Sequence, residues 1–467
     1  MSAGCFLAGR GDVAARPQRA VIRELDRSRD VHHFVSRPDL KPPKVSVRRR
    51  ATATAPGLLF ITPSSGPGQR GVLIVDDKGE PIWFQDTPHR ATTNLRVASY
   101  KGEPVLTWWE GKTEHGLGDG DHVIVDASYR EVARFPAGGG RRADLHEFIV
   151  TPSGTALVAA WDIQTVDLSK SGHGRKQVVE GVVQELEIPT ARVLFEWRSL
   201  DHVAVSETHA GAGRLFDYFH INAIDVDGDG DLLVSARNTW TVYKIARRDG
   251  KVVWRLGGRK SDFALGRGAS FAWQHDARWQ QGGKVVTLFD NGTSPQVEPQ
   301  SRGLVLSLDT RRKRAELVRA YTHVPPVLAH IFGSVQTQPN GNVLVGWGAD
   351  PYFTEYAADG RIRFDASLPT GGQSYRTLRF PWRGRPAERP TLAARGGQLF
   401  ASWNGTTETS AWRLEGGRTP AALRAITTRP RTGFETVLSA PTNTTHASVT
   451  ALDRDGKPLA TSPTIQL

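Results

Sequence analysis

The sequence predicts an all-β protein, with a six-bladed β-propeller followed by a small C-terminal β-sandwich. Patterns with the period of a helix are rare. Short alternating apolar runs end at Asp-Gly, Asn-Gly and Ser-Gly turns, which is typical of antiparallel strands. Residues that form turns are abundant, with 48 glycines and 28 prolines among 467 residues. This length is too great for one ordinary core, so two domains or one large repeat array are expected.

A recurring hairpin of the form (Asp/Arg)-x-x-Gly-Lys-Val-x-Trp predicts the number of blades. Its matching positions are Ile82, Val132, Val193, Val252, Ala315 and Ile362. The mean spacing between neighbours is 56 residues, which suits a blade of four short strands. Six such units fill the 334 residues from Gly57 to Pro390, and seven blades are the alternative. Because a propeller protects its sheet edges by closing its ring, residues 56–65 and 374–382 are the expected closing pair.

The pattern divides the chain into three parts. Residues 1–55 form a basic, Pro-rich segment that we expect to be largely irregular, and residues 56–390 form the propeller. After a Pro/Arg linker at 383–390, residues 391–467 contain short strands and predict a β-sandwich of immunoglobulin or fibronectin type. The chain has no Cys pair, which excludes the antibody type. The expected role of this module is accessory, as a cap, a spacer or a surface-binding unit.

Charge and cysteine content exclude several classes of protein. The net charge is +12, but the first 50 residues hold 12 Lys/Arg and 5 Asp/Glu, so a nearly balanced body gives little reason to expect a nucleic-acid partner. Cys5 is the only cysteine, which excludes an intrachain disulfide and a cysteine-based zinc site. No stretch reaches the roughly 20 apolar residues of a membrane helix. The apolar patch in Met1–Arg10 lacks the pattern of a secretory leader, so a cytoplasmic location stays open.

A second repeat predicts the functional site. Five stretches each carry a marker residue at their second position and end with an apolar strand. They span residues 93–109, 145–161, 219–238, 274–291 and 332–348. The markers are Asn94, His146, His220, His275 and Gly333. Fifteen residues after the marker stand Trp109, Trp161, Asp290, Gly348 and, after a two-residue insertion, Arg237. Since equivalent positions of a closed repeat face one axis, we expect three imidazoles and one guanidinium to converge.

Three interpretations of these histidines remain open. Each could be a hydrogen-bonded core residue, or the three could hold zinc together with a water molecule. Arg237 disfavours the metal, because a fixed cation beside a dication is unfavourable. In the third interpretation a neutral imidazole attacks a phosphoryl or sulfuryl group while the other cations hold its oxygens. The chain has no phosphate-binding loop, and the acidic run at 225–231 is expected to be a tight turn and not a calcium loop. We therefore expect no metal and no cofactor.

Several blocks together resemble the arylsulfotransferase family, in the branch found in actinobacteria and fungi. They are DLHEFIVTPSGTALVAAW (144–161), FHIN (219–222), SARN (235–238), WQHDAR (273–278) and LFDNG (288–292). The resemblance covers about residues 31–390. Residues 391–467 resemble the β-sandwich tail of some actinobacterial members.

The resemblance implies a six-bladed propeller that transfers a sulfuryl group from a phenolic sulfate to a phenol without a nucleotide donor. By position, His275 would carry the sulfuryl group, His220, Asn222 and Arg237 would hold its oxygens, and His146 would be the third channel histidine. The expected substrate-binding residues are Asn222, Asn238, Asp290, Asn291 and Asn94. Both partners would be small molecules, and the location would be extracellular or in the cell envelope. The alternative is a non-catalytic propeller whose cationic channel binds an anionic ligand.

Overall fold

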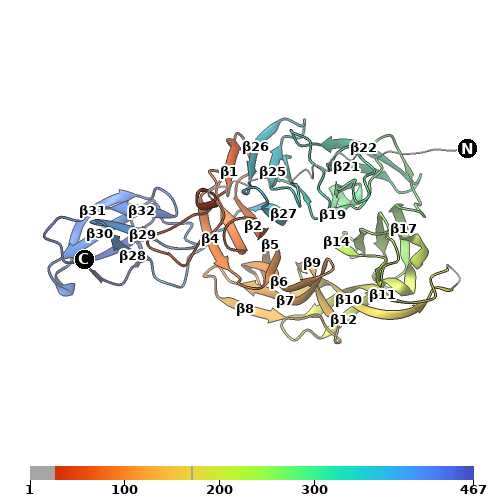
Figure 1. Ribbon diagram of the computed structural model, residues 1–467, viewed down its shortest axis with the longest axis horizontal. Helices are drawn as coiled ribbons and strands as arrows, with labels where there is room; N and C mark the ends of the chain where they lie inside the picture. The colour runs from red at the N-terminus through yellow and green to blue at the C-terminus, as the bar shows by residue number, and fades with distance from the viewer. Residues whose placement is uncertain (1–26, 170–171) are drawn as a thin grey trace, which may run out of the picture.

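The computed structural model describes residues 27–169 and 172–467, and nearly all of its regular structure is strand. The expectations for Met1–Arg10 and Cys5 lie outside the described residues. Between Ser46 and Phe380 the strands form six sheets, which Figure 1 shows arranged around a ring. The helical turns are short: η1 (Arg27–Asp30), α1 (Ser199–His202), η3 (Val205–Glu207), η4 (Gln281–Gly283) and η5 (Pro420–Ala422). The predicted all-β propeller is therefore confirmed.

The first three sheets cover the N-terminal half of the ring. The first sheet contains β2 (Leu58–Ser65), β3 (Gly71–Val75), β4 (Pro81–Asp86) and β27 (Gln373–Phe380). The second contains β5 (Ala91–Tyr100), β6 (Glu103–Glu114), β7 (Leu117–Val125) and β8 (Glu131–Phe135). The third contains β9 (Arg142–Val150), β10 (Thr155–Asp167), β11 (Arg175–Glu187), β12 (Val193–Arg198) and β13 (Leu215–Asp217).

The other three sheets complete the ring. The fourth contains β14 (Ile221–Val226), β15 (Leu232–Ala236), β16 (Thr241–Ile245) and β17 (Val252–Gly257). The fifth contains β18 (Ala264–Leu265), β19 (His275–Gln280), β20 (Val285–Asp290), β21 (Arg302–Asp309) and β22 (Arg314–Tyr321). The sixth contains β23 (Ser334–Thr337), β24 (Val343–Gly346), β25 (Tyr352–Tyr356), β26 (Ile362–Ser367) and β1 (Ser46–Arg49).

Two antiparallel pairings connect the first strands of the chain to the last strands of the propeller. Strand β2 pairs antiparallel with β27, from Leu58 opposite Phe380 to Ser65 opposite Gln373, so the predicted closing pair is confirmed. Strand β1 pairs with β26 in the sixth sheet. The N-terminal segment, predicted to be largely irregular, therefore contributes a strand, because the outer edge of β26 is open for hydrogen bonding.

The inner strands of the ring carry bulges at the marker residues. One edge strand of each sheet lies nearest the centre of the ring (Figure 1). These inner strands are β5, β9, β14, β19, β23 and β27. The pairing register shifts between Thr93 and Arg96, and again between Ile221 and Ala223 and between His275 and Arg278. A bulge bends its strand and re-aims side chains. The repeat therefore marks the places where the inner strands turn side chains toward the axis.

Two further sheets follow the propeller in the C-terminal module. One contains β28 (Thr391–Arg395), β29 (Gln398–Ser402) and β32 (Glu435–Leu438). The other contains β30 (Ala411–Gly417), β31 (Arg424–Pro430), β33 (His446–Leu452), β34 (Pro458–Thr461) and β35 (Ile465–Gln466). Both sheets contribute to one apolar cluster around Trp403 and Trp412. The module is thus a sandwich of two sheets, as the strand pattern indicates.

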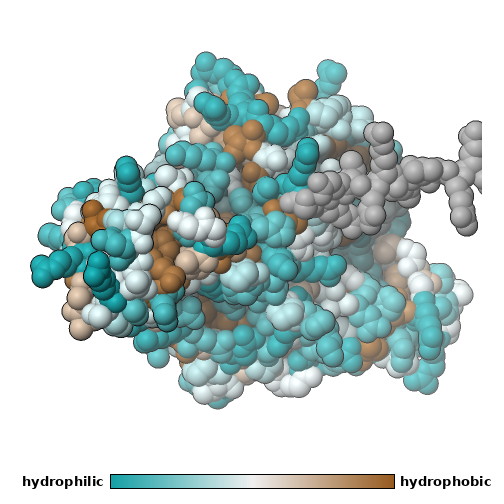
Figure 2. Space-filling view, turned by 60° about the vertical axis from the view of Figure 1, so that its left-hand side comes forward, coloured by the Kyte–Doolittle hydropathy of each residue, from teal (hydrophilic) through white to brown (hydrophobic). Residues whose placement is uncertain are grey.

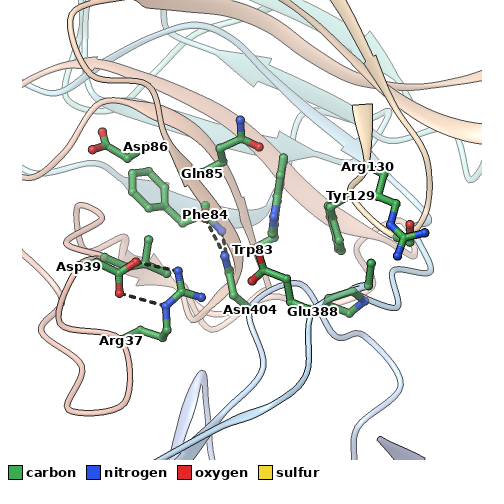
Figure 3. Close-up of a pocket in the computed structure, with 14 residues that line it drawn as sticks. Arg37, Asp39, Trp83, Phe84, Gln85, Asp86, Tyr129, Arg130, Glu388 and Asn404 are labelled. Atoms are coloured by element: carbon green, nitrogen blue, oxygen red, sulfur yellow. Dashed lines mark hydrogen bonds and ion pairs between the residues drawn. The ribbon is translucent and has the colours of Figure 1, made fainter. Parts of the chain in front are cut away.

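Polar contacts attach this module to the first two sheets. The Asn404 amide donates to the carbonyl of Phe84 and accepts from its N–H, so it extends the edge of β4 (Figure 3). The Tyr129 hydroxyl donates to the carbonyl of Gly405 at 2.6 Å. A hollow of about 600 Å³ lies at this seam, and its Arg37 side chain donates two hydrogen bonds to Asp39. The contacts of Asn404 and Tyr129 hold the module against the propeller at this seam.

The molecular surface is mixed in character. On the face shown in Figure 2, the hydrophobic residues lie in small groups separated by hydrophilic ones. In the parts of the chain that the structure describes, no helix is long and apolar enough to cross a membrane.

Candidate active site

One pocket brings together the four residues that the repeat predicts. His146 on β9, His220 just before β14, His275 on β19 and Arg237 just after β15 all line a pocket of about 600 Å³. His146 and His275 are almost fully buried, with exposed fractions of 2% and 1%. Asn238 lines the same pocket. Residues up to 129 positions apart therefore meet because the inner strands surround one axis.

His146 and His220 form a hydrogen-bonded pair backed by two carboxylates. The Nδ1 atom of His146 lies 2.8 Å from Oδ2 of Asp144, and the Nδ1 atom of His220 lies 2.5 Å from Oδ2 of Asp217. A carboxylate only accepts, so both Nδ1 atoms carry hydrogen. The two Nε2 atoms face each other at 3.2 Å, and one of them must donate. The pair therefore holds one extra proton between its Nε2 atoms and carries one positive charge.

The partners of His275 also place its hydrogen on Nδ1, but its Nε2 atom has no histidine partner among the described residues. Asn291 donates from Nδ2 to the carbonyls of Ala329 and Phe332, which sets the orientation of its amide. Its Oδ1 atom therefore faces Nδ1 of His275 at 2.7 Å, and the Trp273 carbonyl lies 3.2 Å from the same nitrogen. Both neighbours only accept, so Nδ1 carries the hydrogen and Nε2 keeps its lone pair.

Burial and the nearby Arg237 guanidinium hold the pKa of His275 well below its usual value. His275 is therefore neutral at pH 7. Burial also lowers the pKa of His146, but Asp144 acts in the opposite direction. Burial raises the pKa of Asp144, yet the His146 and His220 imidazoles outweigh this effect, and the pKa lies below its usual value. Burial outweighs Asp144, so the pKa of His146 also lies below its usual value. One pocket thus combines the neutral His275 with a histidine pair whose hydrogen bond requires one extra proton.

Arg237 is held flat against an aromatic ring. Its guanidinium carbon lies 4.8 Å from the centre of the Trp273 ring, which is within the range of a cation–π contact. It donates to Oδ1 of Asn238 at 2.9 Å and to the His330 carbonyl at 3.2 Å. Two of its five N–H groups are used in these bonds, so others remain for an anion in the pocket. Asn238 in turn donates to the Asp217 carbonyl, which ties Arg237 to the histidine pair.

Four of the five predicted substrate-binding residues do not line this pocket. Asn94 is buried in the channel, where it donates to Glu147 and accepts from Arg376. Asn222 is fully buried and donates to the Gln274 carbonyl. Asp290 accepts from Arg302 and from the N–H of Ala272, which fixes the turn before β19. Of these, only Asn94 shares the repeat position of the histidines, and it lies within a register shift of β5. Asn291 acts on His275 and is absent from the pocket lining.

A buried ionic cluster lies behind the histidines. Glu147, next to His146, has an exposed fraction of 1% and pairs with Arg278 and Arg376. Arg376 also pairs with Asp276, the neighbour of His275, at 3.0 Å. Residues adjacent to two of the histidines are therefore joined through one guanidinium on the closing strand β27.

Tyr375, beside Arg376, reaches the same strands. Its hydroxyl lies 3.0 Å from the carbonyl oxygen of His146 and 2.9 Å from that of Asn222, and donates between them. The ring is buried, with an exposed fraction of 1%. This residue therefore links the bulges that carry His146 and His220.

Sequence reasoning missed the groups that set the protonation of the site. Asp144 and Asp217 precede their histidines by two and three residues, so the spacing Asp-x-His and Asp-x-x-His was a usable signal. Tyr375 and Arg376 stand 100 residues beyond His275 and give no local signal. Only closure of the ring brings them to the site.

The acidic run at 225–231 forms a turn, as expected. Oδ1 of Asp227 accepts from the N–H groups of Asp229 and Asp231, and the Lys244 ammonium pairs with Asp227 and Asp231. Lys244 therefore fills the place that a cation would take. Within residues 27–169 and 172–467, no group of three or more His, Cys, Asp or Glu side chains is placed to hold a metal ion.

The fold and the site define a β-propeller with a cationic histidine pocket on its axis. The sequence profile of the arylsulfotransferase family matches residues 96–368, more than half of the chain, so the protein belongs to this family. Membership confirms the family resemblance and supports aryl sulfotransferase activity in general, with small-molecule substrates. The actinobacterial and fungal branch stays a prediction. No match was found among curated protein sequences.

Solved structures with a similar fold are distant in sequence. A protein of unknown function from Bacteroides caccae is 15% identical, with 69% of this chain and 98% of that chain covered and a TM-score of 0.44. A protein from Lactobacillus plantarum is 12% identical, with 83% and 100% covered and a TM-score of 0.37. Virginiamycin B lyase from Staphylococcus aureus is 9% identical, with 77% and 97% covered and a TM-score of 0.33.

Proposed function

We propose that this protein transfers a sulfuryl group from a phenolic sulfate ester to a phenol through a sulfated His275, without a nucleotide donor or a cofactor. The observation that carries the proposal is the hydrogen bonding of His275. Asn291 holds the hydrogen on Nδ1, so the Nε2 lone pair is free in a pocket that also contains a guanidinium and a charged histidine pair. A neutral nucleophile beside fixed cations suits attack on an anionic ester.

In the first step, Nε2 of His275 forms a bond to sulfur as the bond between sulfur and the phenolic oxygen breaks. The electron pair of that bond leaves with the phenolic oxygen. The proton held between His146 and His220 passes to this oxygen, so the product departs as a neutral phenol. Arg237 and the histidine pair stabilise the sulfuryl oxygens, where charge gathers in the transition state.

The second step reverses the first with a new phenol. The acceptor hydroxyl gives its proton to the neutral histidine pair while its oxygen forms a bond to sulfur. The bond between sulfur and Nε2 of His275 breaks, and the pair of electrons returns to the imidazole. The aryl sulfate product leaves, and the histidine pair again holds one extra proton. Atoms and charges balance over the two steps without a metal.

The test is incubation with 4-nitrophenyl sulfate, with and without a phenol acceptor and with no nucleotide. Release of nitrophenol should depend on the acceptor, and without acceptor the intact mass of the protein should increase by one SO₃ group. His275→Ala should show neither signal. His446→Ala removes a partly exposed histidine of the C-terminal module and serves as the control, with normal release and a normal adduct.

Two results would contradict the proposal. An SO₃ adduct that persists in His275→Ala would move the covalent step to another residue. Saturable binding of several aryl sulfates with no release and no adduct would favour the non-catalytic propeller that binds an anionic ligand.

A further inference from the structure

A second hollow lies beside the candidate active site. Its volume is about 590 Å³, close to that of the pocket with the histidines. Its lining is mixed: the apolar side chains are those of Leu168, Val205, Ala210, Ala212 and Phe216, and the polar ones are those of Asp167, His173, Ser206 and Thr208. Phe216 belongs to the core beneath the third and fourth sheets, and Leu168, Val205 and Ala212 pack against that core. The hollow therefore has an apolar floor that is fixed to the body of the propeller.

The segment 208–217 separates the two hollows, and its residues alternate between them. His209, Gly213, Leu215 and Asp217 line the histidine pocket, whereas Thr208, Ala212 and Phe216 line the second hollow. Alternation with a period of two is the geometry of an extended chain. Ala210 and Gly211 line both hollows. The partition is thus one chain thick, and both hollows meet at Ala210 and Gly211.

The partition is exposed and open to its surroundings at Gly211. This residue is exposed and has no side chain, and a Cβ atom added to it would have no neighbour within 4 Å. In the described part of the chain, the hydrogen bonds donated by residues 210–214 stay inside the segment: the Ala210 N–H donates to the Thr208 hydroxyl and the Gly213 N–H donates to the Gly211 carbonyl. A ligand group can therefore pass over this point without breaking contacts to the rest of the fold.

We propose that the second hollow binds an apolar substituent of the phenolic substrate, so that preferred substrates are phenols with an alkyl or similar hydrophobic tail. This inference rests on the proposed function, because it places the phenolic oxygen at His275 and the tail across Gly211. A pocket of about 600 Å³ already encloses a drug-sized ligand. A second hollow of similar size has a largely apolar floor and shares Ala210 and Gly211 with the first, so it extends the site toward larger hydrophobic molecules.

The test compares 4-ethylphenol, 4-butylphenol and 4-hexylphenol as acceptors, with 4-nitrophenyl sulfate as donor. Each buried methylene group should raise kcat/KM by roughly fourfold. Burial of only two of the additional methylene groups of 4-hexylphenol would therefore make the ratio of kcat/KM for 4-hexylphenol to that for 4-ethylphenol at least about tenfold. Gly211→Val raises the partition in open space and should lower this ratio by at least about fivefold. Asp167 already lines the hollow, and Ser206→Asp adds a second carboxylate there, which should lower the ratio as well.

A matched control exists in the acidic turn after β14. Gly228 also has no neighbour within 4 Å of an added Cβ atom, and it lies outside both hollows, so Gly228→Val should leave the ratio unchanged. A ratio near one in the wild-type protein, or a high ratio that survives both Gly211→Val and Ser206→Asp, would overturn the inference.

The two proposals fail in different ways. Transfer to all three phenols without preference would retain the proposed function and exclude the tail site. If no phenol is sulfated, the proposed function fails, and calorimetric binding of 4-hexylphenol and 4-ethylphenol decides the tail site. Tighter binding of 4-hexylphenol that is lost in Gly211→Val would support the site, and equal binding of both phenols would exclude it.

Discussion

Replacing Asp144 by Asn tests whether the histidine pair holds the transferable proton. Oδ1 of Asp144 accepts from the N–H groups of Gly118 and Leu145, so the amide oxygen of Asn would keep this place. The new NH₂ group would then donate toward Nδ1 of His146. This forces the hydrogen of His146 onto Nε2 and removes the negative charge that favours protonation. The variant therefore keeps its shape but loses the charged form of the pair.

The size of the effect follows from the hydrogen bond that is lost. Asp144 raises the pKa of His146, and a hydrogen bond to a charged group contributes about 1.5–3 kcal/mol. This corresponds to a shift of about 1–2 pH units. Because the first step needs a proton from the pair, we expect activity to fall as pH rises through the pKa of His146. That basic limb of the kcat profile should therefore move to lower pH by about 1–2 units, and kcat at its optimum should fall about 100-fold or more.

The assay is the pH dependence of kcat with 4-nitrophenyl sulfate and phenol. Glu180→Gln is the control, because it removes a fully buried carboxylate that pairs with Arg198 on β12, away from the pocket. It should leave the basic limb unchanged. A basic limb of Asp144→Asn that coincides with the wild-type one would refute the shared proton.

Three further predictions concern the groups around the pair. Arg237→Lys should lower kcat/KM for the donor about 100-fold, measured by steady-state kinetics, because a point charge replaces a planar fork of donors. Tyr375→Phe should lower kcat about tenfold with KM nearly unchanged, because the carbonyls of His146 and Asn222 lose their shared donor. A fall in kcat that the loss of thermal stability fully explains would contradict this prediction. Glu147→Gln should cost about 3–5 kcal/mol in urea unfolding, because unpaired arginines remain buried.

The same glutamate predicts how stability depends on pH. Although burial acts in the opposite direction, the surrounding arginines hold the pKa of Glu147 below its usual value. A depressed pKa contributes stability above the unfolded value, near 4.3, and this contribution is lost as pH falls toward the folded value. Wild-type protein should therefore lose stability below about pH 4.3, and Glu147→Gln should lose less over the same range.

The sequence was sufficient for features that repeat along the chain. The hairpin repeat predicted the propeller, and the terminal apolar strands predicted the pairing of β2 with β27. The marker repeat brought His146, His220 and His275 into one set, and the pocket contains all three. These features are accessible because a closed ring converts a fixed position in the repeat into a fixed position in space.

Features that depend on backbone detail were not accessible. Asn94 occupies the same repeat position as the histidines but points into the ionic cluster, because a local bulge rotates it. The N-terminal segment reads as irregular, yet β1 pairs with β26 because the ring leaves that edge open. Both outcomes depend on neighbours that lie far away in the sequence.

Closure of the ring and assembly of the site depend on the same strand. Strand β27 pairs with β2 to complete the first sheet, and its Tyr375 and Arg376 reach across the axis to the strands that carry the histidines. Arg376 is 97% buried and bonds to Glu147, which adjoins His146, so its charge is compensated only when the inner strands are in place. The placement of the strands that carry His146 and His275 therefore depends on contacts that form only in the closed ring. This coupling explains why the residues that position the site stand about 100 residues beyond the last catalytic histidine.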